Sequence, residues 1–214
     1  MKNALVSLFF ALAAFSADAQ SEKFTKAMES ALAGMDTLKT AAQWQEKSNA
    51  FERIAQKEPA QWLPAYYVGF CQTQVFNYEK DAAKQEAIVA KADLFLAKAD
   101  SLQPQNSEIL VVKSMAAGLH IRLNPMVNGQ KYGMLSGMAI EMAKKLDPTN
   151  PRVDLQQGIT LFFTPEQWGG DKKKAKELME TAGTKFISFK PLSSIHPTWG
   201  MATLQYMLAM AAKG

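Results

Sequence analysis

Four prolines recur at nearly equal intervals along the chain, and their spacing constrains the fold more than any other feature. Pro59, Pro104, Pro148 and Pro191 lie 45, 44 and 43 residues apart. Because proline interrupts a helix, each interval predicts one pair of antiparallel helices. Small and large apolar residues also recur at fixed offsets before these prolines: Phe51 in the first unit, Ala92, Leu96 and Ala99 in the second, and Ser136, Ile140 and Ala143 in the third.

Apolar residues with helical spacing predict most of the chain to be helical. The predicted helices cover residues 21–33, 38–56, about 62–76, 84–102, 107–123, 134–146, 151–163, 171–186 and 198–212. Residues 124–133 are rich in turn formers and predict a loop, and residues 164–170 predict an ordered loop held by Trp168. A repeat of this kind usually has about 34 residues, so about ten extra residues per unit are assigned to loops.

The chain resembles the secreted tetratricopeptide-repeat proteins of Bacteroidota over nearly its whole mature length. This resemblance implies an all-α fold, a short TPR-like right-handed array of antiparallel helix pairs with elongated repeats, and export from the cytoplasm. It implies no activity. The segments that carry it are Phe51-Glu52-Arg53-Ile54, Trp62-Leu63-Pro64-Ala65-Tyr66-Tyr67, Asn124-Pro125-Met126 with Lys131-Tyr132-Gly133, Phe163-Thr164-Pro165-Glu166, and His196-Pro197-Thr198-Trp199-Gly200.

A second, shorter resemblance connects the chain with the helical T-component of TRAP transporters. It rests on the Gly169-Gly170-Asp171 helix start and on the repeat spacing. It implies that the protein handles a small ligand in the periplasm.

The first 19 residues have the order of a secretory signal peptide. Lys2 precedes an apolar run from Ala4 to Phe15, and Ala17-Asp18-Ala19 forms a small-residue cleavage site. The apolar run is too short to span a bilayer, and no later stretch is apolar enough to do so. We therefore expect cleavage after Ala19, a single TPR-like domain over residues 20–214, and a periplasmic or secreted product without a membrane span. The lone cysteine excludes an internal disulfide framework.

The basic excess does not favour nucleic acid as a partner. The net charge is +4, and only Lys172-Lys173-Lys174 forms a run. This run lies in the first turn of a predicted helix behind Asp171, and no ladder of basic and aromatic residues accompanies it.

Groups that could react are scarce, so we expect no enzyme, no cofactor and no metal site. Two histidines and one cysteine cannot build a zinc site of the usual spacing. His120 lies in an apolar helix, which favours a structural role, and Cys71 follows Phe70 in a buried pattern typical of an inert thiol. A hydrolase that uses His196 or His120 is the least favoured alternative.

A binding surface is the better functional candidate. The first helix of each pair lines the concave face of such arrays, and here its predicted inner positions are apolar and aromatic. They either form a closed core or line a groove, in which Tyr66 and Tyr67 would place polar groups at the rim. The predicted binding residues are Tyr66, Tyr67, Phe70, Met115, Leu155, Ile159 and Phe162 of the inner face, Tyr132 and Trp168 of the two loops, and His196.

Two functions remain open at this stage. The first is a non-catalytic protein- or peptide-binding or scaffolding module of the cell envelope. The alternative is a periplasmic carrier of an apolar small molecule, whose ligand would fill the space between the inner helices. The identity of the partner does not follow from the residues.

Overall fold

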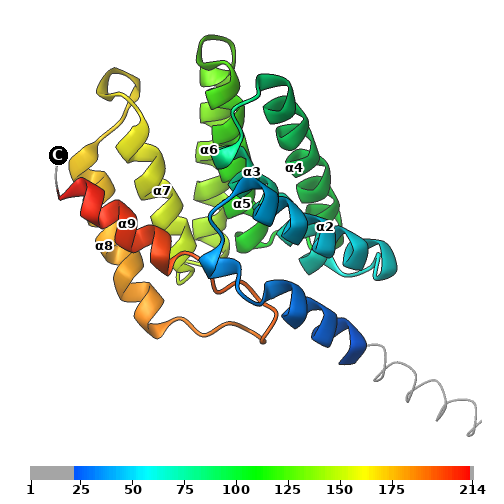
Figure 1. The fold of residues 1–214 in the computed structure, drawn as a ribbon. Helices are drawn as coiled ribbons and strands as arrows, with labels where there is room; N and C mark the ends of the chain where they lie inside the picture. The colour runs from blue at the N-terminus through cyan, green and yellow to red at the C-terminus, as the bar shows by residue number, and fades with distance from the viewer. Residues whose placement is uncertain (1–21, 213–214) are drawn as a thin grey trace, which may run out of the picture.

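The computed structural model describes residues 22–212, and this part of the chain is all-α (Figure 1). The predicted signal peptide lies outside the described residues. Residues 22–32 form the first described helix, and no strand occurs between residues 22 and 212. The helices that follow are α2 (Ala41–Lys57), α3 (Trp62–Tyr78), α4 (Ala82–Leu102), α5 (Ser107–Leu123), α6 (Pro125–Leu146), α7 (Pro151–Phe163), α8 (Lys172–Ser188) and α9 (Met201–Ala211), with short 3-10 turns at Met35–Thr37 and Glu166–Trp168.

Side-chain caps fix where most of these helices begin. The side chains of Asp81, Asn106, Asn150 and Asp171 each accept a hydrogen bond from a backbone N–H in the first turn of α4, α5, α7 and α8, respectively. Such caps satisfy N–H groups that have no partner within the helix. At α7 the cap is followed by Pro151, whose fixed φ suits the first helical position.

The predicted loop at residues 124–133 is wrong, because residues 125–133 form the first two and a half turns of α6. Asn124 caps the helix by accepting a hydrogen bond from the backbone N–H of Val127, and Pro125 occupies the first helical position. A proline at that position starts a helix, although the same residue further along would break one. The glycines at 129 and 133 are tolerated inside the helix, so Tyr132 lies on a helix and not on a loop.

The extra length of the repeats accordingly lies mainly in the helices. Helices α4 and α6 have 21 and 22 residues, and only Asn124 separates α5 from α6. The predicted loop after α7 does exist, but Trp168 does not hold it in place, since its side chain is 74% exposed. Backbone hydrogen bonds hold this loop instead, from Asp171 to Leu161 and from Gly170 to Pro165.

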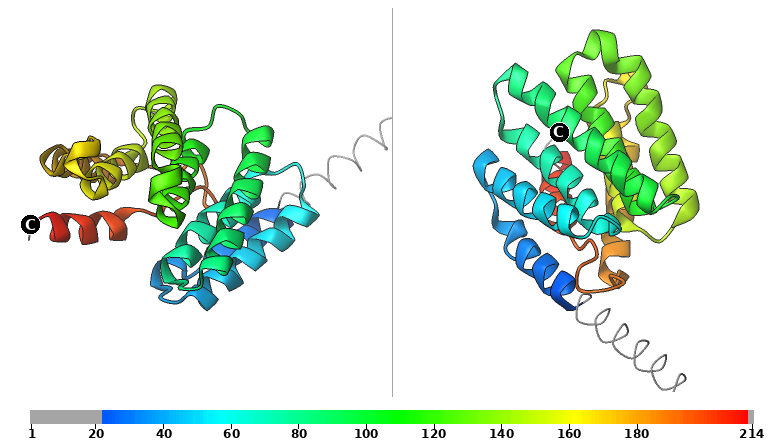
Figure 2. Two further views of the ribbon diagram at one scale, coloured as in Figure 1. Left: turned by 90° about the horizontal axis from the view of Figure 1, so that it is seen from above. Right: turned by 90° about the vertical axis from the view of Figure 1, so that its right-hand side faces the viewer.

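Helices that are neighbours in the sequence pack against each other, from α2 through α8, as the predicted helix pairs require. Helices α7, α8 and α9 lie on one side of α5 and α6, and helices α2, α3 and α4 lie on the other side (Figures 1 and 2). Helix α3 packs against α2, α4 and α5, which explains why thirteen of its seventeen residues are buried. Gly69 allows this close packing, because a Cβ there would lie 2.6 Å from the side chain of Leu96 on α4.

The segment that connects α8 to α9 departs from the repeat pattern. Residues 189–200 are not helical and run back across the molecule to the first described helix, where Ser194 Oγ donates to Glu29 Oε1 at 2.6 Å (Figure 1). The segment ends at Gly200, where φ is +123° and a Cβ would lie 2.5 Å from the Phe186 ring. Only glycine fits this position without strain. We call residues 189–200 the crossing segment.

Candidate functional site

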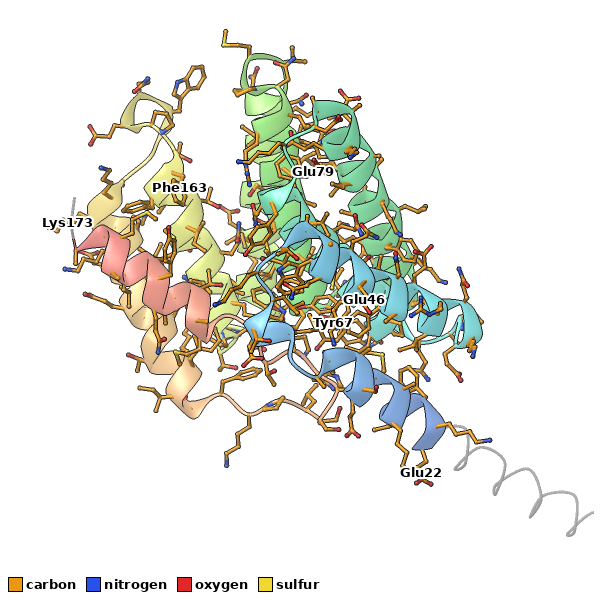
Figure 3. The ribbon with its side chains drawn as sticks, viewed as in Figure 1. Glu22, Glu46, Tyr67, Glu79, Phe163 and Lys173 are labelled. Carbon is orange, nitrogen blue, oxygen red and sulfur yellow. The ribbon has the colours of Figure 1, made fainter. Side chains whose placement is uncertain are left out.

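The crossing segment covers the inner face that the sequence pattern marks as a binding surface. Tyr66, Tyr67, Phe70 and Leu155 are at most 4% exposed. Figure 3 shows Tyr67 in the crowded interior, whereas Phe163 lies at the outer end of α7. The two tyrosine hydroxyls therefore do not lie at a rim, and this part of the inner face is packed as core.

Hydrogen bonds and ring contacts attach the crossing segment to α3. Tyr67 Oη donates to the carbonyl of Ile195 at 3.2 Å, and Trp199 Nε1 donates to Tyr66 Oη at 2.8 Å. The Trp199 ring also stacks on Phe70, with 4.5 Å between ring centroids. Because the bond to Ile195 satisfies a Tyr67 hydroxyl that would otherwise be buried without a partner, the segment stabilises the face that it covers.

Side chains from the first helices of three successive helix pairs form a hydrogen-bonded polar chain beneath the segment. Tyr66 of α3 donates to Glu108 Oε2 of α5 at 3.4 Å, and Arg152 of α7 donates to Glu108 Oε1 at 3.0 Å. Arg152 is fully buried and also donates to the carbonyl of Pro197. Its guanidinium lies over the rings of Phe189 and Trp199, 4.6 and 5.3 Å from their centroids.

Burial dominates the protonation behaviour of this polar chain. It raises the pKa of the Glu108 carboxyl, and the positive charge of Arg152 opposes this shift only in part. It also raises the pKa of Tyr66 well above the ordinary value, with the Glu108 charge acting in the same direction. These groups therefore hold the fold together, and the structure gives them no access to a ligand.

The remaining predicted binding residues fall into separate groups: Met115 packs against the hydrophobic cluster of Tyr66 and Phe70, whereas Ile159 and Phe162 pack with Leu155 in another cluster. Met115, Ile159 and Phe162 are half-buried, and Trp168 is exposed at the end of the loop after α7. His196 lies in the crossing segment against the edge of Trp62, and its Nδ1 is 2.8 Å from Ser193 Oγ. Burial lowers the pKa of His196. The structure brings Tyr66, Tyr67 and Phe70 together, but it does not join them with Trp168 or Tyr132.

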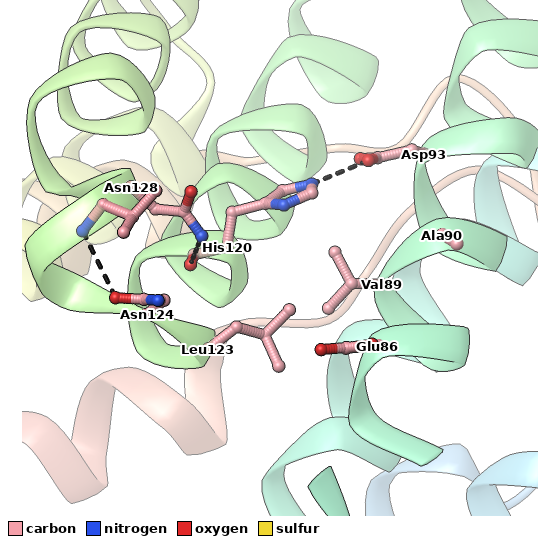
Figure 4. Close-up of a pocket in the computed structure, with 9 residues that line it drawn as sticks. Glu86, Val89, Ala90, Asp93, His120, Leu123, Asn124 and Asn128 are labelled. Carbon is pink, nitrogen blue, oxygen red and sulfur yellow. Dashed lines mark hydrogen bonds and ion pairs between the residues drawn. The ribbon is translucent and has the colours of Figure 1, made fainter. Parts of the chain in front are cut away.

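A cavity on the outside of the array offers a different candidate site (Figure 4). It has a volume of about 470 Å³ and lies between α4, α5 and the start of α6. The hollow is open to solvent and five of its nine lining residues are polar, so it is more polar than a usual small-molecule site, although its volume falls within their usual range of roughly 300–1,000 Å³. The cavity is lined by Glu86, Val89, Ala90 and Asp93 of α4, by His120 and Leu123 of α5, and by Asn124, Val127 and Asn128.

His120 is the central polar group of this cavity. Its Nε2 lies 2.7 Å from Asp93 Oδ2, and its ring stacks on Tyr132 of α6, with 3.9 Å between centroids and 8° between planes. Asn128 Nδ2 donates to the backbone carbonyl of His120 at 2.7 Å and ties α6 to the same turn. Figure 4 shows the imidazole with one edge toward Asp93, in the part of the cavity bounded by Val89 and Leu123.

This arrangement leaves one imidazole nitrogen available. No described residue hydrogen-bonds Nδ1 of His120, whereas a carboxylate holds Nε2. A histidine that binds a metal usually has its other ring nitrogen held in this way by a carboxylate or a carbonyl. The site therefore has the chemistry of a single oriented imidazole beside an apolar wall.

Sequence reasoning identified His120 and Tyr132 separately but missed their partners. Asp93 lies 27 residues before His120, on a different helix, and it carries no signal that distinguishes it from any other exposed carboxylate. The stacking of Tyr132 was also not predictable, because residues 124–133 were assigned to a loop. A second cavity of about 510 Å³ between α2, α3 and α4 contains neither histidine nor cysteine.

The described residues offer little for catalysis or for a free metal ion. Neither histidine belongs to a hydrogen-bonded set that contains both a hydroxyl or thiol and a carboxylate, because among the described residues the His120 ring hydrogen-bonds only Asp93 and the His196 ring only Ser193. Burial raises the pKa of the Cys71 thiol, which keeps it protonated. No group of three His, Cys, Asp or Glu side chains within residues 22–212 is arranged to hold a metal ion. None of the described helices is both long and apolar enough to cross a membrane.

Comparison with known proteins finds one informative similarity. The chain is similar to the HusA haemophore from Porphyromonas gingivalis, with 28% sequence identity and a TM-score of 0.77. The similarity covers 89% of this chain and 93% of the haemophore. No family model matches the chain, and no curated protein matches it. Membership of the tetratricopeptide-repeat family therefore stays a prediction.

Proposed function

We propose that this protein is a non-catalytic carrier of a planar, largely apolar small molecule of the haem class. The observation that carries the proposal is the similarity to a haemophore over nearly the full length of both chains. A haemophore is a binding protein, so the coarser expectation of a binding role agrees with this neighbour. That this chain binds haem in particular is part of the proposal.

The cavity around His120 supports this ligand class. A porphyrin supplies four of the iron ligands, so the protein needs to add only one or two side chains. A site with one oriented histidine is therefore suited to haem iron, although it is unsuited to a bare metal ion. Leu123 and Val127 offer apolar surface to the ring, whereas Val89 behind them is 1% exposed. In the proposed complex His120 offers one ring nitrogen to the iron, and Asp93 holds the other.

The closed inner face weighs against the alternative of a peptide-binding groove. An extended peptide would have to displace the crossing segment, including the stack of Trp199 on Phe70 and the hydrogen bond from Tyr67 to Ile195. The outer cavity needs no such displacement. We therefore favour the small-molecule carrier over the protein scaffold, and we place it outside the cytoplasm, where the leader at residues 1–19 would direct it.

Titration of purified protein with haemin tests the proposal. We expect saturable binding near one haem per chain, a red-shifted Soret band and quenching of tryptophan fluorescence. Absence of saturable binding by the wild-type protein would overturn the function. His120→Ala should remove the spectrum of iron bound to histidine.

His196→Ala is the matched control for the site, because it removes the only other histidine and leaves the cavity intact. It should bind haem like the wild type. Protoporphyrin without iron separates the two contributions, since it should bind wild type and His120→Ala with similar affinity. Haem binding with an unchanged spectrum in His120→Ala would place the ligand elsewhere and leave the carrier function standing.

A further inference from the structure

The cavity around His120 contains two carboxylates and no cationic side chain from lysine or arginine. Among the described residues that line it, Glu86 and Asp93 are acidic, and none is a lysine or an arginine. Asp93 is held by the histidine, whose Nε2 lies 2.7 Å from Asp93 Oδ2. Glu86 takes part in none of the ion pairs between residues 22 and 212. A ligand in this cavity therefore meets an excess of negative charge.

Both carboxylates project from the same side of α4. Glu86, Ala90 and Asp93 are spaced by four and three residues, which places them on one face of an α-helix. The two acidic residues are about two turns apart, or about 10.5 Å along the axis. Ala90 between them has a small side chain and leaves space in front of the helix. Figure 4 shows the Glu86 carboxylate on the side of α4 that faces Leu123 of α5.

The opposite wall of the cavity supplies no charge that would offset the carboxylates. Leu123 and Val127 are apolar. The two amide side chains of this wall are engaged with the backbone: Asn124 Oδ1 accepts from the N–H of Val127 at 3.2 Å, and Asn128 Nδ2 donates to the carbonyl of His120 at 2.7 Å. A ligand carboxylate inside the cavity would find no lysine or arginine among the lining residues.

Cations on the surrounding helices are directed elsewhere. Lys91 of α4 pairs with Glu52 of α2 at 2.5 Å, and Arg122 of α5 donates to Asn77 of α3 at 2.7 Å. The ammonium of Lys131 on α6 lies 5.0 Å from the centroid of a neighbouring tyrosine ring. None of these three side chains lines the cavity.

This charge distribution restricts how a porphyrin can enter. Porphyrins of the haem class carry two propionate groups on one edge of the ring, whereas the other edges are apolar. Like charges repel, and salt screens the repulsion only beyond a Debye length of roughly 8 Å at physiological ionic strength. A ring that presents its propionate edge to α4 would place like charges together. A ring that enters by an apolar edge leaves the propionates in the solvent, to which the cavity is open.

We propose that Glu86 is a specificity-determining residue of the cavity, and that its charge keeps the carboxylate edge of the ligand in the solvent. The protein then recognises the iron and the apolar edge of the ring, and it gains nothing from the propionates. The proposal rests on the proposed carrier function, because it concerns the same cavity. The ligand class that it implies is a metalloporphyrin whose carboxylates are not needed for binding.

Titration of the wild type and of Glu86→Gln with haemin and with haemin dimethyl ester tests the proposal. At about 0.05 M salt, Glu86→Gln should bind haemin about five-fold more tightly than the wild type, because one repelling charge is removed. The ester carries no propionate charge, so both proteins should bind it with affinities that agree within about two-fold. Raising the salt to about 0.5 M should strengthen haemin binding by the wild type, relative to the ester, more than binding by Glu86→Gln.

Glu141→Gln is the matched control, because it removes one negative charge from the chain outside the cavity. Glu141 lies on α6, 13 residues beyond Asn128 and thus about 20 Å further along the helix. This variant should bind haemin within about two-fold of the wild type. Glu86 and Glu141 are both exposed, so neither substitution should change the helical circular dichroism spectrum.

The possible failures can be told apart. If the wild type and Glu86→Gln both fail to bind haemin and its ester saturably, the carrier function is overturned and this inference with it. If the wild type binds haemin and Glu86→Gln binds it with the same affinity, only the role of Glu86 is overturned. A gain of the same size for the ester, or in Glu141→Gln, would also overturn that role, because the effect would then not arise from repulsion between Glu86 and the propionates.

Discussion

Replacing Arg152 with leucine should destabilise the protein strongly, because this residue carries a charge in a fully buried position. Its guanidinium donates to Glu108 at 3.0 Å and to the carbonyl of Pro197. Leucine retains apolar volume beneath Phe189 and Trp199 but leaves the Glu108 carboxylate without its cation. Removing one partner of a buried ion pair costs about 3–5 kcal/mol. For a domain of this size, that loss corresponds to a lower melting temperature, by on the order of 10 °C.

Urea unfolding at pH 7, followed by circular dichroism, measures this cost. A double-mutant cycle with Glu108→Gln separates the charge pair from the packing of the crossing segment. Because the double variant contains no unpaired charge, its loss should be smaller than the sum of the two single losses, by about 2–3 kcal/mol. A loss below ~1 kcal/mol for Arg152→Leu, or losses that simply add, would refute the view that this pair is buried and coupled.

Three further predictions follow from buried groups and close contacts. Because the pKa of Glu108 is raised in the folded state, its contribution to stability is fully present below the ordinary value of 4.5 and is lost as the pH rises through the folded-state value. The unfolding free energy of the wild type should therefore fall more between pH 4 and 7 than that of Glu108→Gln. Parallel pH dependences of the two proteins would contradict this. The raised pKa and burial of Cys71 predict that its thiol reacts with a disulfide reagent only after unfolding, and rapid labelling of the native protein at pH 8 would show the burial to be wrong. Gly170→Ala should destabilise the protein by about 2 kcal/mol or more, because the alanine Cβ would lie 1.7 Å from the carbonyl oxygen of Thr164. An unchanged melting temperature would disprove that close contact.

The surroundings of the two histidines distinguish His196, which has a structural role, from His120, which is the candidate haem-iron ligand. His196 belongs to the crossing segment, where it contacts Trp62 and Ser193. His120 instead lies at the wall of a cavity, held by Asp93 and Tyr132. From the sequence, His120 was expected to be structural and His196 was named as a candidate binding residue. The two histidines differ because Asp93 of α4 hydrogen-bonds His120 at the edge of the cavity, whereas no carboxylate hydrogen-bonds the His196 ring.

The sequence by itself determined the all-α class, the division into helix pairs and most of the helix starts. These features depend on local physics: a proline interrupts a helix, an Asn or Asp side chain caps one, and apolar residues at helical spacing require a buried side. Local signals failed at residues 124–133, where the same proline and glycines suit both a loop and the start of a helix. The choice depended on Tyr132 and Ser136 packing against α5, which is not a local property.

Only the tertiary structure decided what covers the inner face and where a ligand could bind. The apolar positions of α3, α5 and α7 left open whether this face is a closed core or a groove, and they did not indicate that residues 189–200 cover it. The contact between Tyr67 and Ile195 joins residues 128 positions apart, and the pair of Asp93 with His120 joins two helices. Such contacts depend on how the helix pairs stack and on where residues 189–200 run back across them. A periodic pattern along the sequence predicts neither of these.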